Sequence, residues 1–421
     1  MDKFPADLPQ HHPVSAGLSA SPVVESSWKR RVLGLVSAGF ILYGLCQSTR
    51  LLTPSFHTDP VEQVLQLQPL TDGHNDFPFI IRAFYHNHIY QSNFSDQIEL
   101  PYHVDFPRLA RGRVRGQFWS VYIPCNESET TPKPNYEYVH DTLQQIDLVH
   151  RLATLYPENL ELVPDSAAFR HTFTNSPSRI ASFIGVEGLH QIGSSAATLR
   201  LYHSLGVRYT TLTHVCHNEY ADSASPAQPL HNGLSAAGHA MVQEMNRLGM
   251  AVDLAHVSAK TMHDALDASS APVIFSHSSV YAMCPNPRNV PDDVLHRLAD
   301  NDGVIMITFF PEYTRCEDPA AATLADVADH IQYVGELIGY RHVGLGSDFD
   351  GMERTIKGLE DVSKYPDLIR ELLDRGISVE DVAGVIGGNI LRVMGEIEQV
   401  ARQMQEEGIP PLEDDVPDVF E

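Results

Sequence analysis

Positive charge is scarce in this sequence. Its 421 residues include 29 lysines and arginines against 54 aspartates and glutamates, which gives a formal net charge of −25 at pH 7. A surface this acidic repels phosphate backbones and therefore argues against nucleic acid as a partner. Nucleotide-binding fingerprints are missing as well, because no P-loop or Rossmann glycine pattern occurs and the glycines of "GLGSDFDG" (344–351) have neither spacing. The hydrophobic fraction of 43% is nevertheless normal for a globular protein and is sufficient for a buried core.

Cysteine is also infrequent, with five in the chain. One of them, Cys46, lies in an apolar run near the N-terminus, which leaves Cys125, Cys216, Cys284 and Cys316. No two form a C-x-x-C pair, so a zinc ribbon or a thiol redox motif is not expected. In an oxidising compartment the four could form two disulfides, in any of three pairings. The sequence alone does not choose among them.

A long apolar run is lacking too. The run at residues 32–46 is short for a membrane-spanning helix, which needs about 20 residues. Its length also fits the apolar part of a signal peptide. The length of chain before it and the lack of a clear small-x-small cleavage site after it favour an uncleaved anchor. Basic residues at 29–31 place the N-terminus in the cytoplasm. We therefore predict a disordered cytoplasmic tail (1–30), a single-pass transmembrane signal anchor (31–49) and a linker (50–64), with a cleaved signal peptide and a buried core helix as the alternatives.

The rest of the chain is expected outside the cell or in the lumen of an organelle. Two N-x-S sequons, at Asn93 and Asn126, agree with this secretory route. At the other end, residues 401–421 are acidic and contain proline, which predicts a solvated extension. This tail has no hydrophobic segment, so a lipid anchor of the GPI type is not expected.

Between residues 65 and 400 the sequence alternates short apolar runs with amphipathic segments. The apolar runs lie at residues 66–74, 116–124, 182–188, 209–215, 250–256, 272–277, 303–310 and 342–351. Helical patterns follow most of them, for example at residues 141–156, 234–249, 258–270, 291–300, 324–339 and 365–376. Eight strands that alternate with helices predict a parallel (β/α)8 barrel, of the TIM type. A doubly wound open sheet is the competing architecture.

Most of the apolar runs end in a histidine or a carboxylate. These residues are His74 and Asp76, Glu187, His214, His256, His277 and Asp348. In a barrel, the C-terminal ends of the strands converge on one active site, whereas an open sheet would spread the same side chains along an edge. The pattern therefore favours the barrel, with the site at the C-terminal ends of its strands.

These strand-end residues are hard to explain as ordinary polar residues once they are taken together. A lone histidine such as His256 is more often a hydrogen-bonded core residue, and Asp348 alone could simply cap the next segment. Burying so many ionisable groups at one barrel mouth is costly, however, unless something compensates their charge. A divalent metal supplies that charge, and imidazole and carboxylate are good ligands for zinc. Two metals close together need a shared carboxylate, and Glu187 is the one glutamate in the set.

Several stretches of the sequence resemble one known family. "DGHNDFP", "GVEGLHQIG", "TLTHVCHNEYADS", "LGMAVDLAHVS", "PVIFSHSS", "RNVPDDVL", "GLGSDFDG" and "GLEDVSKYPDLIRELL" occur in that order between residues 65 and 400. They are similar to the membrane dipeptidase (renal dipeptidase) family, which is peptidase family M19 of the amidohydrolase-like barrels. The resemblance does not cover the segments before and after.

The resemblance implies a binuclear zinc site and assigns its ligands. His74, Asp76 and Glu187 would hold one Zn2+ ion. Glu187, His256 and His277 would hold the other, so that Glu187 bridges the two ions.

The resemblance also implies the residues that handle a dipeptide substrate. His214 and Arg288 would bind it, with Tyr313 of "FFPEY" beside them, and Asp348 would be the catalytic aspartate. Arg288 would read the free C-terminal carboxylate as a bidentate donor. This chain departs from the family at Pro287, where relatives often have another basic residue, so the grip on the carboxylate is expected to differ.

The family's covalent and membrane features carry over only in part. Its disulfides suggest Cys125 with Cys216 and Cys284 with Cys316. Its mammalian members are held by a C-terminal lipid anchor, whereas this chain is predicted to use an N-terminal helix, so the cell surface and an endomembrane are both open. The family often forms dimers, and a homodimer is a further expectation.

The sequence is thus expected to encode a zinc-dependent enzyme that hydrolyses dipeptides to amino acids. A hydroxide held between the metals would attack the peptide carbonyl, with Asp348 as proton shuttle and His214 stabilising the oxyanion. Two alternatives stay open. The same barrel could act on another amide, a lactam or an ester, or it could be a non-catalytic, metal-binding receptor module.

Overall fold

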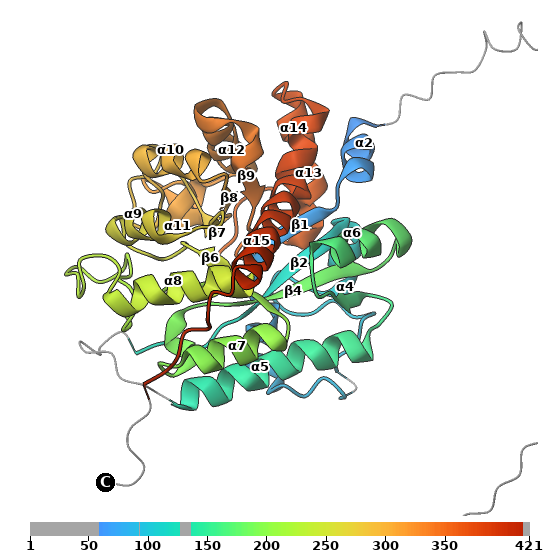
Figure 1. Cartoon of the computed structure of the whole chain (residues 1–421). Coiled ribbons are helices and arrows are strands. Elements are labelled where there is room, and N and C mark those ends of the chain that lie inside the picture. The colour runs from blue at the N-terminus through green and yellow to red at the C-terminus, as the bar shows by residue number, and fades with distance from the viewer. Residues whose placement is uncertain (1–58, 92, 127–135, 416–421) are drawn as a thin grey trace, which may run out of the picture. The chain divides into compact units, whose positions relative to one another are not determined.

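The structure is a computed structural model that describes residues 59–91, 93–126 and 136–415 (Figure 1). A parallel sheet lies at its centre. The strands are β1 (Leu70–Asn75), β2 (Val114–Val121), β3 (Leu160–Leu162), β4 (Ile180–Val186), β5 (Val207–Thr211), β6 (Ala251–Asp253), β7 (Ile274–Ser278), β8 (Val304–Ile307) and β9 (Val343–Leu345). They pair in the order β1-β2-β4-β5-β6-β7-β8-β9, while β3 pairs with β4 outside this path. Most strand residues are buried on both faces, as is typical of parallel sheets covered by helices.

Helices follow the strands and surround the sheet (Figure 1). They are α2 (Pro60–Leu67), α3 (Phe77–Tyr85), α4 (Phe106–Arg111), α5 (Tyr136–Leu155), α6 (Ser166–Asn175), α7 (Ala196–Ser204), α8 (Ala236–Leu248), α9 (Ala259–Ala268), α10 (Asp292–Asp300), α11 (Pro311–Thr314), α12 (Leu324–Ile338), α13 (Tyr365–Asp374), α14 (Val379–Ala383) and α15 (Asn389–Glu406). Short helical turns are η1 (Leu189–Ile192), η2 (Pro319–Ala321), η3 (Tyr340–His342), η4 (Val362–Lys364) and η5 (Gly384–Gly388). Serines start several helices: Ser235 caps α8 and Ser258 caps α9, each through a hydrogen bond from a backbone amide of the first turn.

The sheet closes between its first and last strands. Asn75 forms a parallel bridge with Phe349, just beyond β9. The Asp348 amide donates to the His74 carbonyl at 3.2 Å, and the Ser347 hydroxyl donates to the Asp72 carboxylate at 2.7 Å. The prediction of a (β/α)8 barrel is therefore confirmed, and the closing contacts bring His74 and Asp348 together.

Side chains fill the interior of the barrel. Phe183 of β4, Tyr209 of β5 and Met306 of β8 belong to one buried cluster that also contains Ile390 and Met394 of α15. The first residues of β6, β7 and β8 are in the same cluster, so α15 covers the N-terminal opening of the barrel. Only the opposite end is left for a polar site.

The eight predicted strands all occur, and the differences lie at the ends of the domain and at β3. Strand β3 was not predicted, because it has three residues and only its first is fully buried. The domain was expected at residues 65–400, but α2 begins at Pro60 and α15 ends at Glu406. Asp59 caps α2, whose Val61 and Val64 are buried, which explains the earlier start.

The predicted membrane anchor at 31–49 and the tail at 1–30 lie outside the described residues, as does most of the linker at 50–64. Among the residues that the structure describes, no helix combines the length and the apolar character needed to cross a bilayer. The anchor, the side of the membrane and a homodimer therefore stay predictions.

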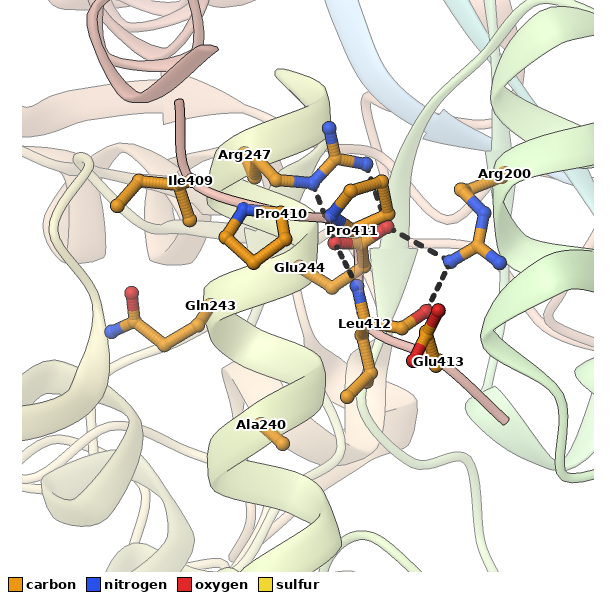
Figure 2. Close-up of a pocket in the computed structure, with 10 residues that line it drawn as sticks. All are labelled: Arg200, Ala240, Gln243, Glu244, Arg247, Ile409, Pro410, Pro411, Leu412 and Glu413. Carbon is orange, nitrogen blue, oxygen red and sulfur yellow. Dashed lines mark hydrogen bonds and ion pairs between the residues drawn. The ribbon is translucent and has the colours of Figure 1, made fainter. Parts of the chain in front are cut away.

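The C-terminal segment after α15 packs against the barrel instead of extending into solvent. Figure 2 shows residues 409–413 lying over α8, beside Arg200 of α7. The Leu412 amide donates to the buried carboxylate of Glu244 at 3.0 Å, and Arg200 donates to the Leu412 carbonyl at 2.7 Å. Asp414 accepts hydrogen bonds from the Ala196 amide at 2.6 Å and the Ser195 hydroxyl at 2.7 Å. The expected solvated tail is thus docked at least as far as Asp414.

Replacing Asp414 with alanine is expected to destabilise the domain by about 1 kcal/mol at pH 7, because the carboxylate binds the first turn of α7. Burial raises the pKa of Asp414, but hydrogen bonds from Ser195, Ala197 and Ala196 outweigh it and hold this pKa below its ordinary value of 3.8. A carboxyl whose pKa is lower in the folded state stabilises above its unfolded pKa and loses that effect as the pH falls through the folded pKa.

Urea unfolding at pH 7 and below pH 4 would test this, since the difference between wild type and variant should shrink in acid. The exposed neighbour Asp415 provides the matched control, because its replacement with alanine is expected to have little effect at either pH. An equal loss for both variants would contradict the specific contact with α7.

Candidate metal centre and active site

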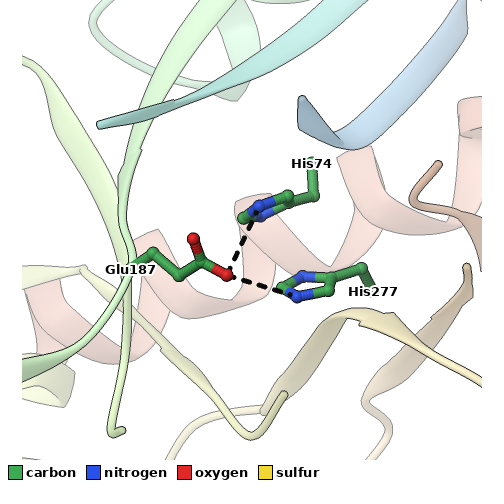
Figure 3. A group of neighbouring side chains, drawn as sticks. All are labelled: His74, Glu187 and His277. Atoms are coloured by element: carbon green, nitrogen blue, oxygen red, sulfur yellow. Dashed lines mark ion pairs between the residues drawn. The ribbon is translucent and has the colours of Figure 1, made fainter. Parts of the chain in front are cut away.

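Glu187, which follows β4, is the common point of the candidate site. Its Oε1 atom lies 3.0 Å from Nε2 of His256, 3.4 Å from Nε2 of His277 and 3.6 Å from Nε2 of His74. Figure 3 shows His74 and His277 both directed at this one oxygen. The residues come from the ends of β1, β4 and β7 and from the loop after β6, as the alternation of strands and helices predicts. Glu187 is therefore placed where a bridging carboxylate would lie.

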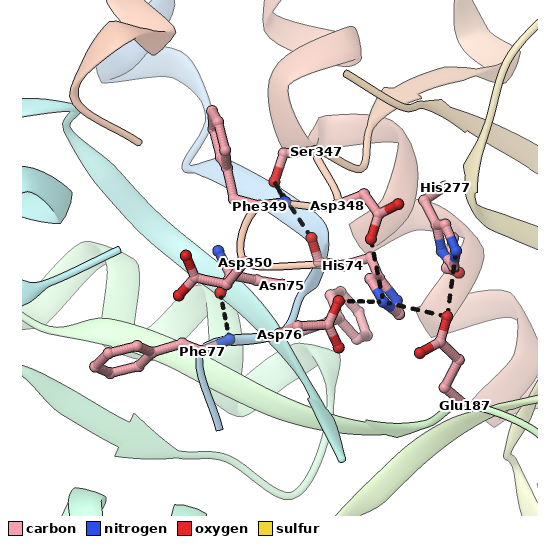
Figure 4. Close-up of polar contacts among 12 residues, drawn as sticks. His74, Asn75, Asp76, Phe77, Glu187, His277, Ser347, Asp348, Phe349 and Asp350 are labelled. Atoms are coloured by element: carbon pink, nitrogen blue, oxygen red, sulfur yellow. Dashed lines mark hydrogen bonds and ion pairs between the residues drawn. The ribbon is translucent and has the colours of Figure 1, made fainter. Parts of the chain in front are cut away.

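Two further carboxylates lie close to the same nitrogen of His74. Nε2 of His74 lies 3.2 Å from Asp76 Oδ2 and 3.9 Å from Asp348 Oδ1 (Figure 4). Within the described residues, three sets of side chains are close enough to hold a metal ion: His74 with Glu187 and His277, Glu187 with His214 and His256, and His74 with Asp76 and Asp348. The five predicted ligands thus lie in one connected cluster, with His214 and Asp348 at its edges.

The backbone at two of these positions is strained. His256 has a φ of 67° and Asp348 a φ of 65°, both in the left-handed region that side chains other than glycine rarely adopt. Such conformations cost about 1–3 kcal/mol each and persist where the surrounding structure enforces them, most often at functional sites. Both residues lie in the segments that follow strands β6 and β9, at the barrel mouth.

Hydrogen bonds to the other ring nitrogen orient two of the histidines. Nδ1 of His74 lies 2.8 Å from the Tyr209 hydroxyl, and Nδ1 of His277 lies 2.8 Å from the Ser276 hydroxyl. Both rings therefore present Nε2 to the cluster. Nε2 of His74 and Oδ1 of Asp76 are buried without a hydrogen-bond partner among the described residues. Buried polar atoms of this kind need a partner, and a metal ion at the centre of the cluster fits them.

The electrostatics of the cluster also fit a cation. Burial lowers the pKa of His74, but the carboxylates of Asp76 and Glu187 outweigh it and raise that pKa to about 10. Burial raises the pKa of Glu187 well above its ordinary value, and burial lowers the pKa values of His256 and His277. The centre therefore attracts positive charge while these two imidazoles stay neutral, which is the form that binds metal.

The predicted substrate-binding residues line one side of this cluster. Nε2 of His214 lies 3.8 Å from Glu187 Oε1, and the His214 ring is 4.4 Å from that of His256, centre to centre. Arg288 is buried, and its guanidinium lies 5.1 Å above the Tyr313 ring. Its Nε and Nη1 atoms have no hydrogen-bond partner among the described residues, so the guanidinium has donors available for a ligand.

Both predicted disulfides are present in the structure. Cys125 pairs with Cys216, which joins the segments after β2 and β5, and Cys284 pairs with Cys316. The predicted glycosylation sites Asn93 and Asn126 are both exposed. Their modification stays a prediction.

Three supporting residues were not found from the sequence. They are Tyr209, which holds His74; Ser276, which holds His277; and Asp253, which accepts a hydrogen bond from Ser276. The only signal for the last two is a polar side chain in an otherwise apolar strand. That signal is weak, since serine and aspartate also occur in strands for local reasons.

Comparison with known proteins places the chain in a family. Residues 58–408 match the family model of membrane dipeptidase (peptidase family M19). Dipeptidase aclJ of Aspergillus oryzae is 60% identical over 371 residues, which cover 88% of this chain and 87% of that protein. Dipeptidase tcpJ of Claviceps purpurea is 47% identical over 372 residues, which cover 88% and 86%.

Two solved structures have the same fold as this chain. The dipeptidase AC, a metallopeptidase of family M19, superposes with a TM-score of 0.69 at 25% identity and covers 78% of this chain and 98% of its own. The probable dipeptidase PvdM from Pseudomonas aeruginosa has the same fold, with a TM-score of 0.71 at 22% identity, and covers 82% of this chain and 100% of its own. The chain belongs to the membrane dipeptidase family, peptidase family M19.

Proposed function

We propose that this protein hydrolyses dipeptides to free amino acids with two zinc ions bound at the cluster around Glu187. The observation that carries the proposal is the position of Glu187 Oε1, which is shared by histidines from both sides of the cluster. His74, Asp76 and Glu187 would hold one ion, and Glu187, His256 and His277 the other. When bound, the two ions would polarise the substrate carbonyl and make a water molecule acidic enough to be a nucleophile near neutral pH.

Asp348 is the proton carrier in this proposal. Burial raises its pKa to about 7, with His74 lowering the value and Asp76 raising it. A carboxyl group with a pKa near the working pH can both accept a proton from the attacking water and give one to the leaving amine. Its place at the edge of the cluster, 3.9 Å from His74, leaves it free for that exchange.

His214 and Arg288 bind the substrate. His214 lies beside Glu187, where its Nε2 can donate to the oxygen of the tetrahedral intermediate, a contact worth a few kcal/mol in the transition state. Arg288 would hold the C-terminal carboxylate, and Tyr313 fixes the guanidinium by stacking against it. A carboxylate site this close to the scissile bond would select dipeptides over longer chains.

The first test is a measurement of zinc per chain by elemental analysis, together with hydrolysis of Gly-Leu and Gly-D-Ala before and after chelation. About two ions per chain, loss of activity on chelation and recovery with added zinc are expected. Zinc without hydrolysis would favour a barrel that acts on another amide, a lactam or an ester. A folded protein that binds no metal would favour the receptor module.

Replacing Arg288 with alanine is expected to reduce kcat/KM for free dipeptides about 10- to 100-fold, mainly through KM, because hydrogen bonds to a charged group contribute about 1.5–3 kcal/mol. The matched comparison is a dipeptide amide, which has no carboxylate and should be a poor substrate for both proteins. Arg288→Lys keeps the charge but loses the bidentate contact, so an intermediate loss of kcat/KM is expected. Equal losses for the free dipeptide and the amide would argue against carboxylate recognition.

A further inference from the structure

A further buried carboxylate, that of Asp253, lies behind the predicted metal ligands. Asp253 ends β6, is fully buried, and is not one of the predicted ligands. Its Oδ1 accepts hydrogen bonds from the amides of Ser276 at 2.8 Å and Ala255 at 3.1 Å. Its Oδ2 accepts hydrogen bonds from the hydroxyls of Ser276 at 2.6 Å and Thr211 at 2.7 Å. Each carboxylate oxygen of Asp253 therefore accepts two hydrogen bonds.

Three of these four hydrogen bonds, the one from Thr211 and the two from Ser276, join three neighbouring strands. Thr211 ends β5, Asp253 ends β6 and Ser276 lies in β7. The ladder between β6 and β7 is thin, with Asp253 and Ile274 as its one register pair, so the Asp253 side chain supplies contacts that the backbone does not. His214, His256 and His277 follow or lie in these same strands. The Asp253 carboxylate therefore connects the strands that carry or precede these three histidines.

The hydroxyl of Ser276 also determines which nitrogen of His277 carries hydrogen. A serine has a single hydroxyl hydrogen, and at 2.6 Å from a carboxylate oxygen that hydrogen is donated to Asp253. The Ser276 oxygen can then only accept at its 2.8 Å contact with Nδ1 of His277. Nδ1 must carry the hydrogen, which leaves the lone pair on Nε2, directed at Glu187.

His277 differs in this respect from the other histidines of the site. The Nδ1 atom of His74 is hydrogen-bonded to a neutral group, the phenol of Tyr209. Nδ1 of His214 and Nδ1 of His256 have no hydrogen-bond partner in the part of the chain that the structure describes. Among the histidines of the site, and within the described residues, only His277 has an Nδ1 atom that is connected through a hydroxyl to a buried carboxylate. Such a connection makes an imidazole more basic and a stronger metal ligand.

We propose that Asp253 and Ser276 are positioning residues that strengthen the binding of one of the two metal ions, the one held by His277, by fixing the orientation and tautomer of this ligand. The inference rests on the proposed metal centre, but it concerns the difference in affinity between the two metal ions. Asp253 and Ser276 act through His277 and do not contact substrate.

The test replaces Ser276 with alanine and measures zinc release by competition with a chelator. One of the two ions is expected to bind about 10- to 100-fold more weakly than in the wild type, while the other keeps its affinity. Thr211→Val is the matched control. It removes the other hydroxyl from the same oxygen of Asp253 but leaves the chain from Asp253 to His277 intact, so both ions should keep wild-type affinity within about threefold.

Two further measurements distinguish a loss of metal affinity from a general loss of structure. Thermal unfolding of the metal-free proteins shows whether the two variants are folded and similarly destabilised. In the unaltered zinc-loaded protein, the Nδ1 hydrogen of His277 is expected to give a downfield proton resonance that exchanges slowly with water, and assignment uses His277→Gln.

Equal weakening of both ions in Ser276→Ala, equal losses in the two variants, or a missing His277 resonance would each overturn the proposal. A wild-type protein that binds no zinc would instead contradict the proposed function.

Discussion

Glu187→Gln is expected to release at least one of the two proposed zinc ions and to reduce dipeptide hydrolysis about a thousandfold or more. Glu187 Oε1 is within 3.6 Å of three histidine Nε2 atoms, so it is the one carboxylate in contact with both halves of the cluster. Glutamine keeps the shape of the side chain but has one oxygen and no charge, so it cannot bridge two cations. Loss of a metal that polarises a carbonyl costs several kcal/mol of transition-state stabilisation.

The measurement is zinc per chain beside kcat for Gly-Leu, with added zinc to test for recovery. Glu244→Gln is the matched control, because Glu244 is also a buried glutamate but binds Arg247, Arg200 and the C-terminal segment. This control is expected to lower the free energy of unfolding while it keeps two ions and most of the activity. Full zinc content and near-normal kcat in Glu187→Gln would refute the bridging role.

The clustering of the strand-end residues could be predicted because barrel geometry and sequence pattern agree. Each apolar run identified a strand, and the polar residue that ended it marked the mouth of the barrel. Glu187 and His277 are separated by 90 positions in the chain, yet both lie at the C-terminal ends of strands that face one interior. The fold thus converts a one-dimensional pattern into a cluster, and the resemblance to a family then gave the individual ligand assignments.

The supporting contacts could not be predicted, because they depend on distances between strands. Asp253 and Ser276 each occupy an unremarkable position in an apolar run, and only the 2.6 Å contact between them reveals their connection to His277. The docked C-terminal segment was missed for a related reason. Its acidic composition predicts solvation, but Asp414 accepts hydrogen bonds from the amides at the start of α7. Amino-acid composition does not reveal such a contact.

Asp348→Asn is expected to lower kcat by about 10²- to 10⁴-fold while both proposed zinc ions stay bound, since this is the usual contribution of a positioned general acid and base. Asparagine tolerates the left-handed backbone at this position, where φ is 65°, so the loop should keep its shape. An amide cannot take up the proton of the attacking water. The measurement is kcat for Gly-Leu across pH 5 to 9, together with zinc per chain.

Asp350→Asn separates this role from a general effect on the loop. Asp350 is also buried and has a φ of 68°, but its carboxylate accepts a hydrogen bond from the His103 amide and does not face His74. We expect a loss of less than about tenfold for this variant, because it changes a buried carboxyl group of the same loop without removing the proposed proton carrier. The pH dependence distinguishes the two further: a wild-type limb near pH 7 that reports the raised pKa of Asp348 should disappear in Asp348→Asn and persist in Asp350→Asn. If both variants lost activity equally, or if Asp348→Asn also lost zinc, Asp348 would have to be reinterpreted as a ligand or as a structural residue.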